Sequence, residues 1–154
     1  MLKKLIATQD DIAPAIARIF LGAIIFPHGA QKILGIWGGH GLDAAINAFG
    51  QWFGFPAFVT VLVALAEFAG ALALILGFGA RFMAGSIMLV MLGAIYFVVG
   101  KHFFMNWYGQ PQYGEGFEFH LLALGLGLIV LLKGAGKYSL DALLIKRLDA
   151  RQNH

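Results

Sequence analysis

Four long apolar stretches occupy most of this 154-residue chain, at residues 12–34, 57–78, 82–99 and 117–132. Each has a length that suits a helix crossing a bilayer core of roughly 30 Å. Only 12% of the residues are charged and 60% are hydrophobic, whereas about 25% of a soluble domain is charged. The sequence therefore predicts an all-α polytopic membrane protein, in which residues 1–154 form one domain built on a bundle of four transmembrane helices.

The composition excludes several function classes. The chain contains no cysteine, so it forms no disulfide and any redox role needs a bound cofactor or a partner. The basic residues lie mostly beyond the apolar stretches, as in membrane proteins, and this placement argues against nucleic-acid binding despite a net charge of +3. The first stretch is about twice as long as the apolar region of a signal peptide and lacks an A-x-A cleavage site. We therefore expect it to be a retained first helix.

The distribution of basic residues predicts the orientation of the chain. One side carries Lys3, Lys4, Arg81, Lys133, Lys137, Lys146, Arg147 and Arg151, and the other carries Lys32 and Lys101. Because lysine and arginine concentrate in cytoplasmic segments, both termini are expected in the cytoplasm. The connections 35–56 and 100–116 are then the outer ones, and both are rich in glycine and aromatic residues.

Two shorter helices are expected at the membrane surfaces. Leu42, Ile46, Phe49 and Phe53 recur at helical spacing within the first outer connection, which is typical of a short amphipathic helix. Residues 139–150 are expected to form a C-terminal interfacial helix capped by Ser139, with leucines facing lipid and basic residues facing water.

Charged residues inside the apolar stretches need partners, because a lone charge in hydrocarbon costs several kcal/mol. Counted from the helix ends at 1.5 Å per residue, Arg18 and Glu67 differ in depth by only about 6 Å. We therefore predict a structural ion pair between Arg18 and Glu67.

The polar residues of the outer half of the bundle suggest a binding site. His28, Gln31, Glu67 and His120 fall within about 10 Å of one another in depth, and the loop 101–116 is expected to cover them. His28, Glu67 and His120 would suit a single transition-metal ion. A quinone-like ligand, bound by hydrogen-bond donors around an apolar slot, is a second reading. Histidines that only donate hydrogen bonds to neighbouring helices are a third, and the spacing leaves all three open.

Several segments resemble the successive signatures of one known family. They are Arg18 to Lys32 (RIFLGAIIFPHGAQK), Gly54 to Pro56, Ala66 to Gly70 (AEFAG), Gly79 to Arg81, and Gly134 to Asp141 (GAGKYSLD). In this order they resemble the DoxX family over nearly the whole chain. The resemblance implies a four-helix bacterial inner-membrane protein. It also implies an association with membrane oxidoreductase assemblies, such as quinone-linked thiosulfate oxidation or oxidative-stress complexes, and it assigns no catalytic residue.

Two functions follow as expectations. The first is a subunit or accessory of a membrane oxidoreductase assembly that carries a small quinone-like or metal site. Its partners would be the lipid bilayer and redox subunits, and the chain could also form a homo-oligomer. The alternative is a non-catalytic membrane scaffold or assembly factor without a cofactor. The chain has no self-contained catalytic motif, so it is at most a subunit of an oxidoreductase.

Overall fold

The computed structural model describes residues 6–99, 102–109 and 115–152, and within these ranges every regular element is helical. Helix α2 spans Ile12–Leu34 and α3 spans Leu42–Phe53. The second apolar stretch forms one continuous helix from α4 (Ala57–Leu65) through the π-helical turn η1 (Ala66–Gly70) to α5 (Ala71–Leu76). The third forms α6 (Ala80–Ala94) and the π-helical turn η2 (Ile95–Val99). Helices α7 (Glu118–Lys133) and α8 (Leu140–Gln152) complete the chain.

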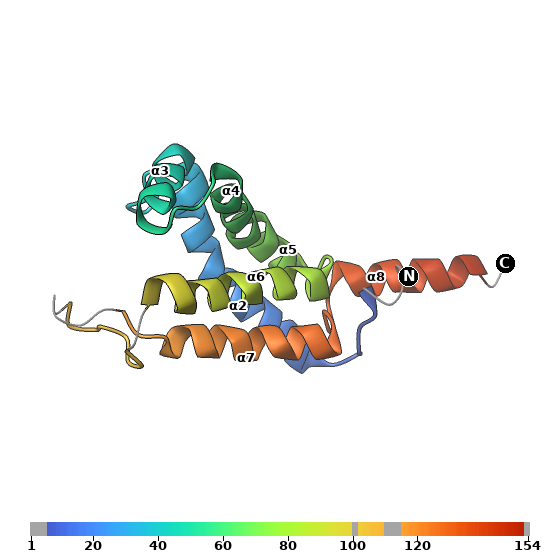
Figure 1. Cartoon of the computed structure of the whole chain (residues 1–154). Coiled ribbons are helices and arrows are strands. Elements are labelled where there is room, and N and C mark those ends of the chain that lie inside the picture. The colour runs from blue at the N-terminus through green and yellow to red at the C-terminus, as the bar shows by residue number, and fades with distance from the viewer. Residues whose placement is uncertain (1–5, 100–101, 110–114, 153–154) are drawn as a thin grey trace.

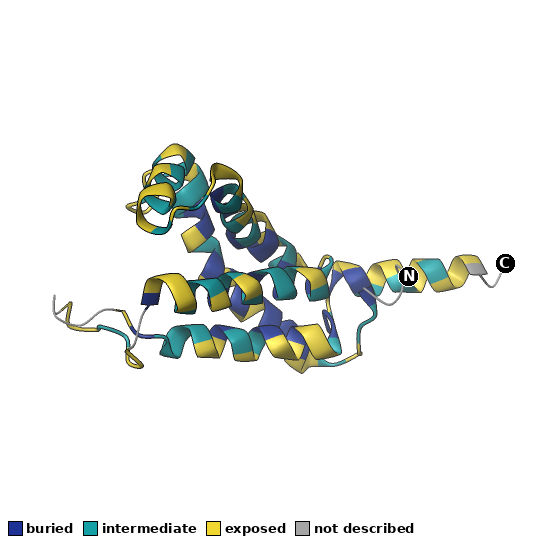
Figure 2. Cartoon of the chain, in the orientation of Figure 1, coloured by how far each residue is buried: buried dark blue, intermediate teal, exposed yellow. Residues whose placement is uncertain are grey.

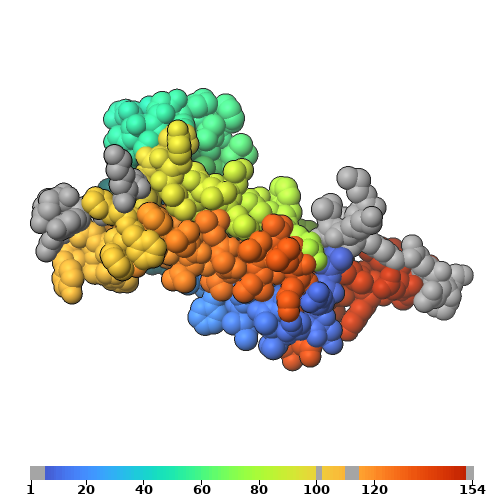
Figure 3. Space-filling model, turned by 60° about the horizontal axis from the view of Figure 1, so that its bottom comes forward, coloured from blue at the N-terminus to red at the C-terminus, as the bar shows by residue number. Residues whose placement is uncertain are grey.

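The helices predicted from the four apolar stretches and the tail agree with those of the structure to within two residues at each boundary, and the predicted amphipathic helix corresponds to α3. Three of them, Ile12–Leu34, Ala57–Leu76 and Ala80–Val99, are long and apolar enough to cross a membrane. Helix α7 is shorter, with 16 residues, and coincides with the fourth apolar stretch. It lies alongside α6 (Figures 1 and 3) and also contacts α2.

The two ends of the bundle differ in what they carry (Figure 1). Residues 6–11, the turn 77–79 and the connection 134–139 meet at one end, which we call the termini end, and α8 leaves the bundle from there. Helix α3 and residues 102–109 and 115–117 lie at the opposite end, which we call the loop end. The chain therefore runs up and down, and both ends of the described chain lie on the same side of the bundle.

The buried centre of the bundle combines many alanines with a few larger apolar residues, and exposed residues cover its outside (Figure 2). The buried core is rich in alanine: Ala17, Ala30, Ala64, Ala71, Ala80, Ala84, Ala123 and Ala135. Phe20, Leu89 and Leu122 are 59%, 72% and 71% exposed. So much apolar surface suits contact with lipid rather than water.

Helix α2 packs against η1 and α5 with its backbone almost in contact. A Cβ atom added at Gly29 would lie 2.3 Å from the backbone nitrogen of Phe68, and one at Gly22 would lie 2.6 Å from the carbonyl oxygen of Ala71. Only glycine fits at such distances. Gly22 and Gly29 therefore allow the two membrane-spanning helices to pack backbone against backbone.

Arg18 is 1% exposed and lies at the termini end rather than beside Glu67. Its guanidinium donates hydrogen bonds to five backbone carbonyls: Leu74 (2.9 Å), Ala135 (2.8 Å), Tyr138 (2.7 Å), Lys137 (3.2 Å) and Ile75. The predicted Arg18–Glu67 ion pair is wrong. In the antiparallel register, Arg18 faces the end of α5, whereas the neighbour of Glu67 and Phe68 on α2 is Gly29. Gly29 is 11 residues, or about 16 Å of helix, away from Arg18.

Asp141, also 1% exposed, joins α8 to the start of α6. Its carboxylate accepts hydrogen bonds from the backbone N–H groups of Gly79 (2.8 Å) and Ala80 (2.9 Å). A carboxylate at a helix N-terminus satisfies free amides and complements the helix dipole. The Gly134–Asp141 segment thus ties α2, α5, α6 and α8 together at one end.

A second carboxylate at the termini end caps α2. Asp11 accepts hydrogen bonds from the backbone N–H of Ala13 (2.9 Å) and from the Lys133 ammonium (2.9 Å). These two contacts, the backbone N–H first, lower the pKa of Asp11. The carboxylate therefore stays ionised at neutral pH.

Helix α8 differs from the expectation in direction. It is helical as predicted, but it extends away from the bundle roughly along the direction of α6 and α7, instead of lying across the end as an interfacial helix would (Figure 1). Contacts at Ser139 and Asp141 hold its first turn. Leu143 is 55% exposed, so the leucines that were expected to face lipid are uncovered.

Candidate functional site: a polar cluster near the loop end

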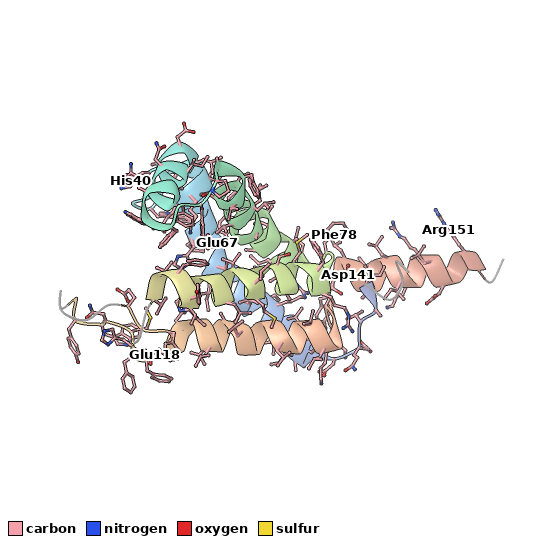
Figure 4. The ribbon with its side chains drawn as sticks, viewed as in Figure 1. His40, Glu67, Phe78, Glu118, Asp141 and Arg151 are labelled. Atoms are coloured by element: carbon pink, nitrogen blue, oxygen red, sulfur yellow. The ribbon has the colours of Figure 1, made fainter. Side chains whose placement is uncertain are left out.

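Glu67 is the acidic residue in the middle of the second apolar stretch, and it is 6% exposed. It belongs to the π-helical turn η1, and Figure 4 shows it inside the bundle at the level of α2 and α6. A π turn widens the helix by one residue, and such turns occur frequently at functional sites. Here the turn stands opposite Gly29, where α2 approaches most closely.

Lys32 is the ion-pair partner of Glu67. Its ammonium lies 2.6 Å from Glu67 Oε2, and the two side chains are 21% and 7% exposed. The same ammonium donates a longer bond of 3.4 Å to the carbonyl oxygen of His28, one turn earlier. Lys32 was expected only as a basic residue on the outer side of the membrane. The close contacts at Gly22 and Gly29 set the register of α2 against the second membrane helix. This register places the last turn of α2, and with it Lys32, beside Glu67.

His28 lies next to this pair, and His120 lies next to His28. His28 is exposed on the bundle surface, within electrostatic reach of Glu67 and Lys32, and its ring centroid lies 6.2 Å from that of Phe119 on α7. His120, the next residue on α7, lies within electrostatic reach of His28. Residues from three segments that are far apart in sequence therefore meet here. We call Lys32, Glu67, His28 and His120 the polar cluster.

His120 carries an unused hydrogen-bonding atom. Its Nδ1 is buried and has no hydrogen-bond partner among the described residues. Leaving a buried polar group unpaired costs about 1–3 kcal/mol, and such a group in a native structure calls for an explanation. A bound ligand would supply one.

Gln31 does not join the polar cluster. Its side-chain amide donates a hydrogen bond to the carbonyl oxygen of Trp37 (2.9 Å), and its backbone carbonyl accepts one from the N–H of Gly41. Gln31 thus closes the connection after α2, and its part in binding a ligand stays a prediction.

The predicted metal set is also corrected. Among residues 6–99, 102–109 and 115–152, no group of three or more His, Cys, Asp or Glu side chains is placed to hold a metal ion. His28, Glu67 and His120 are neighbours without forming a shared coordination shell. The ammonium of Lys32, rather than a metal, is the charge that faces the Glu67 carboxylate.

The described part of the expected covering loop docks on the start of α7. Glu118 accepts hydrogen bonds from the Met105 N–H (3.0 Å) and from Trp107 Nε1 (3.3 Å), and its own N–H donates to the Phe103 carbonyl. Residues 102–108 also line a hollow of about 450 Å³. This contact lies two residues from His120, while residues 101 and 110–114 of the predicted cover lie outside the described residues.

Comparison with known proteins identifies the family. The DoxX family model matches residues 13–100, which include Lys32 and Glu67. The chain belongs to the DoxX family. Among its DoxX-type relatives is the inner membrane protein YqjF of Escherichia coli (strain K12), which is 30% identical over 90% of this chain and 96% of its own length.

A second relative of this DoxX protein is CatD of Bacillus subtilis (strain 168), which is provisionally named an oxidoreductase. It is 27% identical over 88% of this chain and 90% of its own length. No solved structure gave a significant match. The family and the apolar helices agree that this chain is a membrane protein.

Proposed function

We propose that this DoxX protein is a subunit or accessory of an oxidoreductase assembly in the bacterial inner membrane, and that the polar cluster binds a quinone-like ligand. The observation that carries the proposal is the buried His120 Nδ1, which has no hydrogen-bond partner among the described residues and lies near His28, the neighbour of the Lys32–Glu67 pair at the π turn. The names of the two relatives, one an inner membrane protein and one an oxidoreductase, support the location and the chemistry.

The chemistry of the polar cluster favours a quinone over a hydrophilic metabolite. A quinone presents carbonyl oxygens, for which the imidazoles of His28 and His120 and the ammonium of Lys32 are donors, and it needs an apolar slot for its ring. Phe119 lies beside both histidines, and the ring of Phe26 on α2 stacks on that of Phe68, the residue after Glu67, with their centroids 5.2 Å apart. Since the chain has no cysteine, redox chemistry here needs such a carrier or a redox partner.

Calorimetric titration of the detergent-purified protein with a short-chain benzoquinone tests this proposal. We expect saturable binding with one site per chain. His120→Ala should weaken it roughly tenfold, the ratio for one lost hydrogen bond of about 1.4 kcal/mol. His40→Ala is the matched control, because His40 is an exposed histidine of the 35–41 connection. Equal affinity of both variants would refute the assigned site.

The alternative is a membrane scaffold without a ligand. The observation that favours it is that Lys32 and Glu67 already neutralise each other at 2.6 Å. Two results together would support the scaffold over the ligand site. The wild-type protein would bind no quinone, and it would be isolated from native membranes in a complex with redox subunits.

A further inference from the structure

A cavity at the termini end is separate from the polar cluster. It has a volume of about 970 Å³ and lies between the start of the described chain, the end of α5, the connection to α8 and the first two turns of α8. Figure 1 shows these segments together where α8 leaves the bundle. The proposed function does not involve any of its lining residues.

The cavity has an apolar floor. Ile75 and Leu76 are the last two residues of the membrane-spanning helix, and Leu140 and Leu143 of α8 stand across from them. Leu76 is 57% exposed. Because this floor continues the surface of a membrane-spanning helix, it lies where acyl chains meet headgroups.

The rim of the cavity is basic. Lys146 has no ion-pair or hydrogen-bond partner among the described residues, and Lys137 has only a loose contact of 3.9 Å with Asp10, whose side chain is 89% exposed. Loose, exposed pairs of this kind contribute little. Both ammonium groups are therefore available to an anion.

Tyr138 adds an aromatic ring to this rim. Its φ of +54° is unusual for a residue with a Cβ, and the hydrogen bond of 2.7 Å from Arg18 to its carbonyl helps to hold this conformation. The side chain is 86% exposed. Tyrosine is enriched at the level of lipid headgroups, where its ring is amphipathic.

We propose that this cavity binds an anionic phospholipid, with the phosphate between Lys137 and Lys146 and an acyl chain on Leu76 and Leu143. The charge of the rim selects an anion, and the apolar floor at the end of a membrane-spanning helix selects a lipid over a free phosphate or an acidic peptide. The bound lipid would also cover Leu140 and Leu143, two of the leucines that α8 leaves exposed. This inference does not depend on the quinone proposal.

Native mass spectrometry of the detergent-solubilised protein tests the site by titration with phosphatidylglycerol and, separately, phosphatidylcholine. We expect one phosphatidylglycerol to bind at least fivefold more tightly than phosphatidylcholine. The double variant Lys137→Gln/Lys146→Gln should reduce this affinity by roughly fivefold for each lysine. Arg151→Gln, which removes a charge of α8 outside the cavity lining, should leave the affinity unchanged.

Two further arms distinguish a lipid from a free anion. Leu143→Asn should weaken phosphatidylglycerol binding without changing the thermal stability, and millimolar inorganic phosphate should not displace the lipid. Equal binding of the two lipids, equal effects of the double variant and Arg151→Gln, or displacement by phosphate would each overturn the proposal. Quinone affinity, measured on the same variants, should stay at the wild-type value.

Discussion

At the scale of single residues, the buried charges of this protein are stabilised in two different ways. Arg18 is surrounded by backbone carbonyls at the end of α5 and in the segment 134–139, whereas Glu67 pairs with a neighbouring ammonium. The sequence correctly indicated that both charges would be buried and partnered. The predicted pairing is wrong because the depth of each residue was counted from the end of its own helix, and these helix ends were assumed to lie at the same height in the membrane.

Double-mutant cycles can separate the two pairings. Lys32→Met and Glu67→Gln should be non-additive in the free energy of unfolding, with a coupling of about 1 kcal/mol or more, because the two side chains share an ion pair. Arg18→Gln and Glu67→Gln should add to within about 0.5 kcal/mol, because these residues lie far apart. Detergent titration followed by tryptophan fluorescence provides the measurement. Additivity of the Lys32 cycle would contradict the assigned pair.

Gly29 sets the register that brings Lys32 to Glu67. Gly29→Ala should destabilise the protein by about 1–3 kcal/mol, because its Cβ meets backbone atoms that cannot move aside as a side chain would. Gly125→Ala is the control, since no atom outside its own helix lies within 4 Å of a Cβ there. A comparison of thermal midpoints in one detergent is sufficient. Equal midpoints for the two variants would contradict the close backbone contact.

At the scale of elements, the apolar stretches predicted the helices but not the two π turns. Hydropathy defines where a helix begins and ends in a bilayer, and the boundaries agree to within two residues. The π turns at Ala66–Gly70 and Ile95–Val99 depend on which carbonyl each amide finds, and the residue types in AEFAG and IYFVV do not encode this choice. The helical pattern likewise does not reveal the role of Asp141: it places this residue in a tail helix, whereas in the structure its carboxylate caps α6.

The cap from Asp141 predicts local protection from amide exchange. Asp141→Ala should speed hydrogen exchange at Gly79 and Ala80 by roughly fivefold, corresponding to about 1 kcal/mol of lost capping. Asp10→Ala should leave exchange at these two amides unchanged, because the Asp10 carboxylate is exposed and faces Lys137. Hydrogen exchange with mass spectrometric detection resolves this segment. Unchanged exchange in Asp141→Ala would remove the assigned cap.

At the scale of the whole molecule, the all-helical membrane class and the position of both chain ends on one side follow from hydropathy and charge. The direction of α8 does not follow, because its first turn is fixed by Ser139 and Asp141, contacts that the helical pattern alone does not reveal. The metal set failed for a related reason: equal depth does not place His28, Glu67 and His120 around one point.

The charge distribution still predicts that the termini end faces the cytoplasm. Because the chain has no cysteine, each cysteine variant carries a single thiol. Tyr108→Cys places it at an exposed position of the loop end, and Arg151→Cys places it at an exposed position of α8. In intact cells, an impermeant thiol reagent should label the first variant only, while both should react after the cells are opened. Labelling of the cysteine at position 151 from outside would reverse the proposed orientation.

The central claim is that α2, η1 and α7 form one ligand site near the loop end, and photo-crosslinking tests it most directly. A photoreactive azido-benzoquinone, irradiated with the purified protein and mapped by peptide mass spectrometry, should modify residues 26–32 and 117–121. Excess unlabelled short-chain quinone should suppress this labelling, and His120→Ala should reduce it. Labelling confined to α8 and the termini end, or unaffected by competition, would contradict the account.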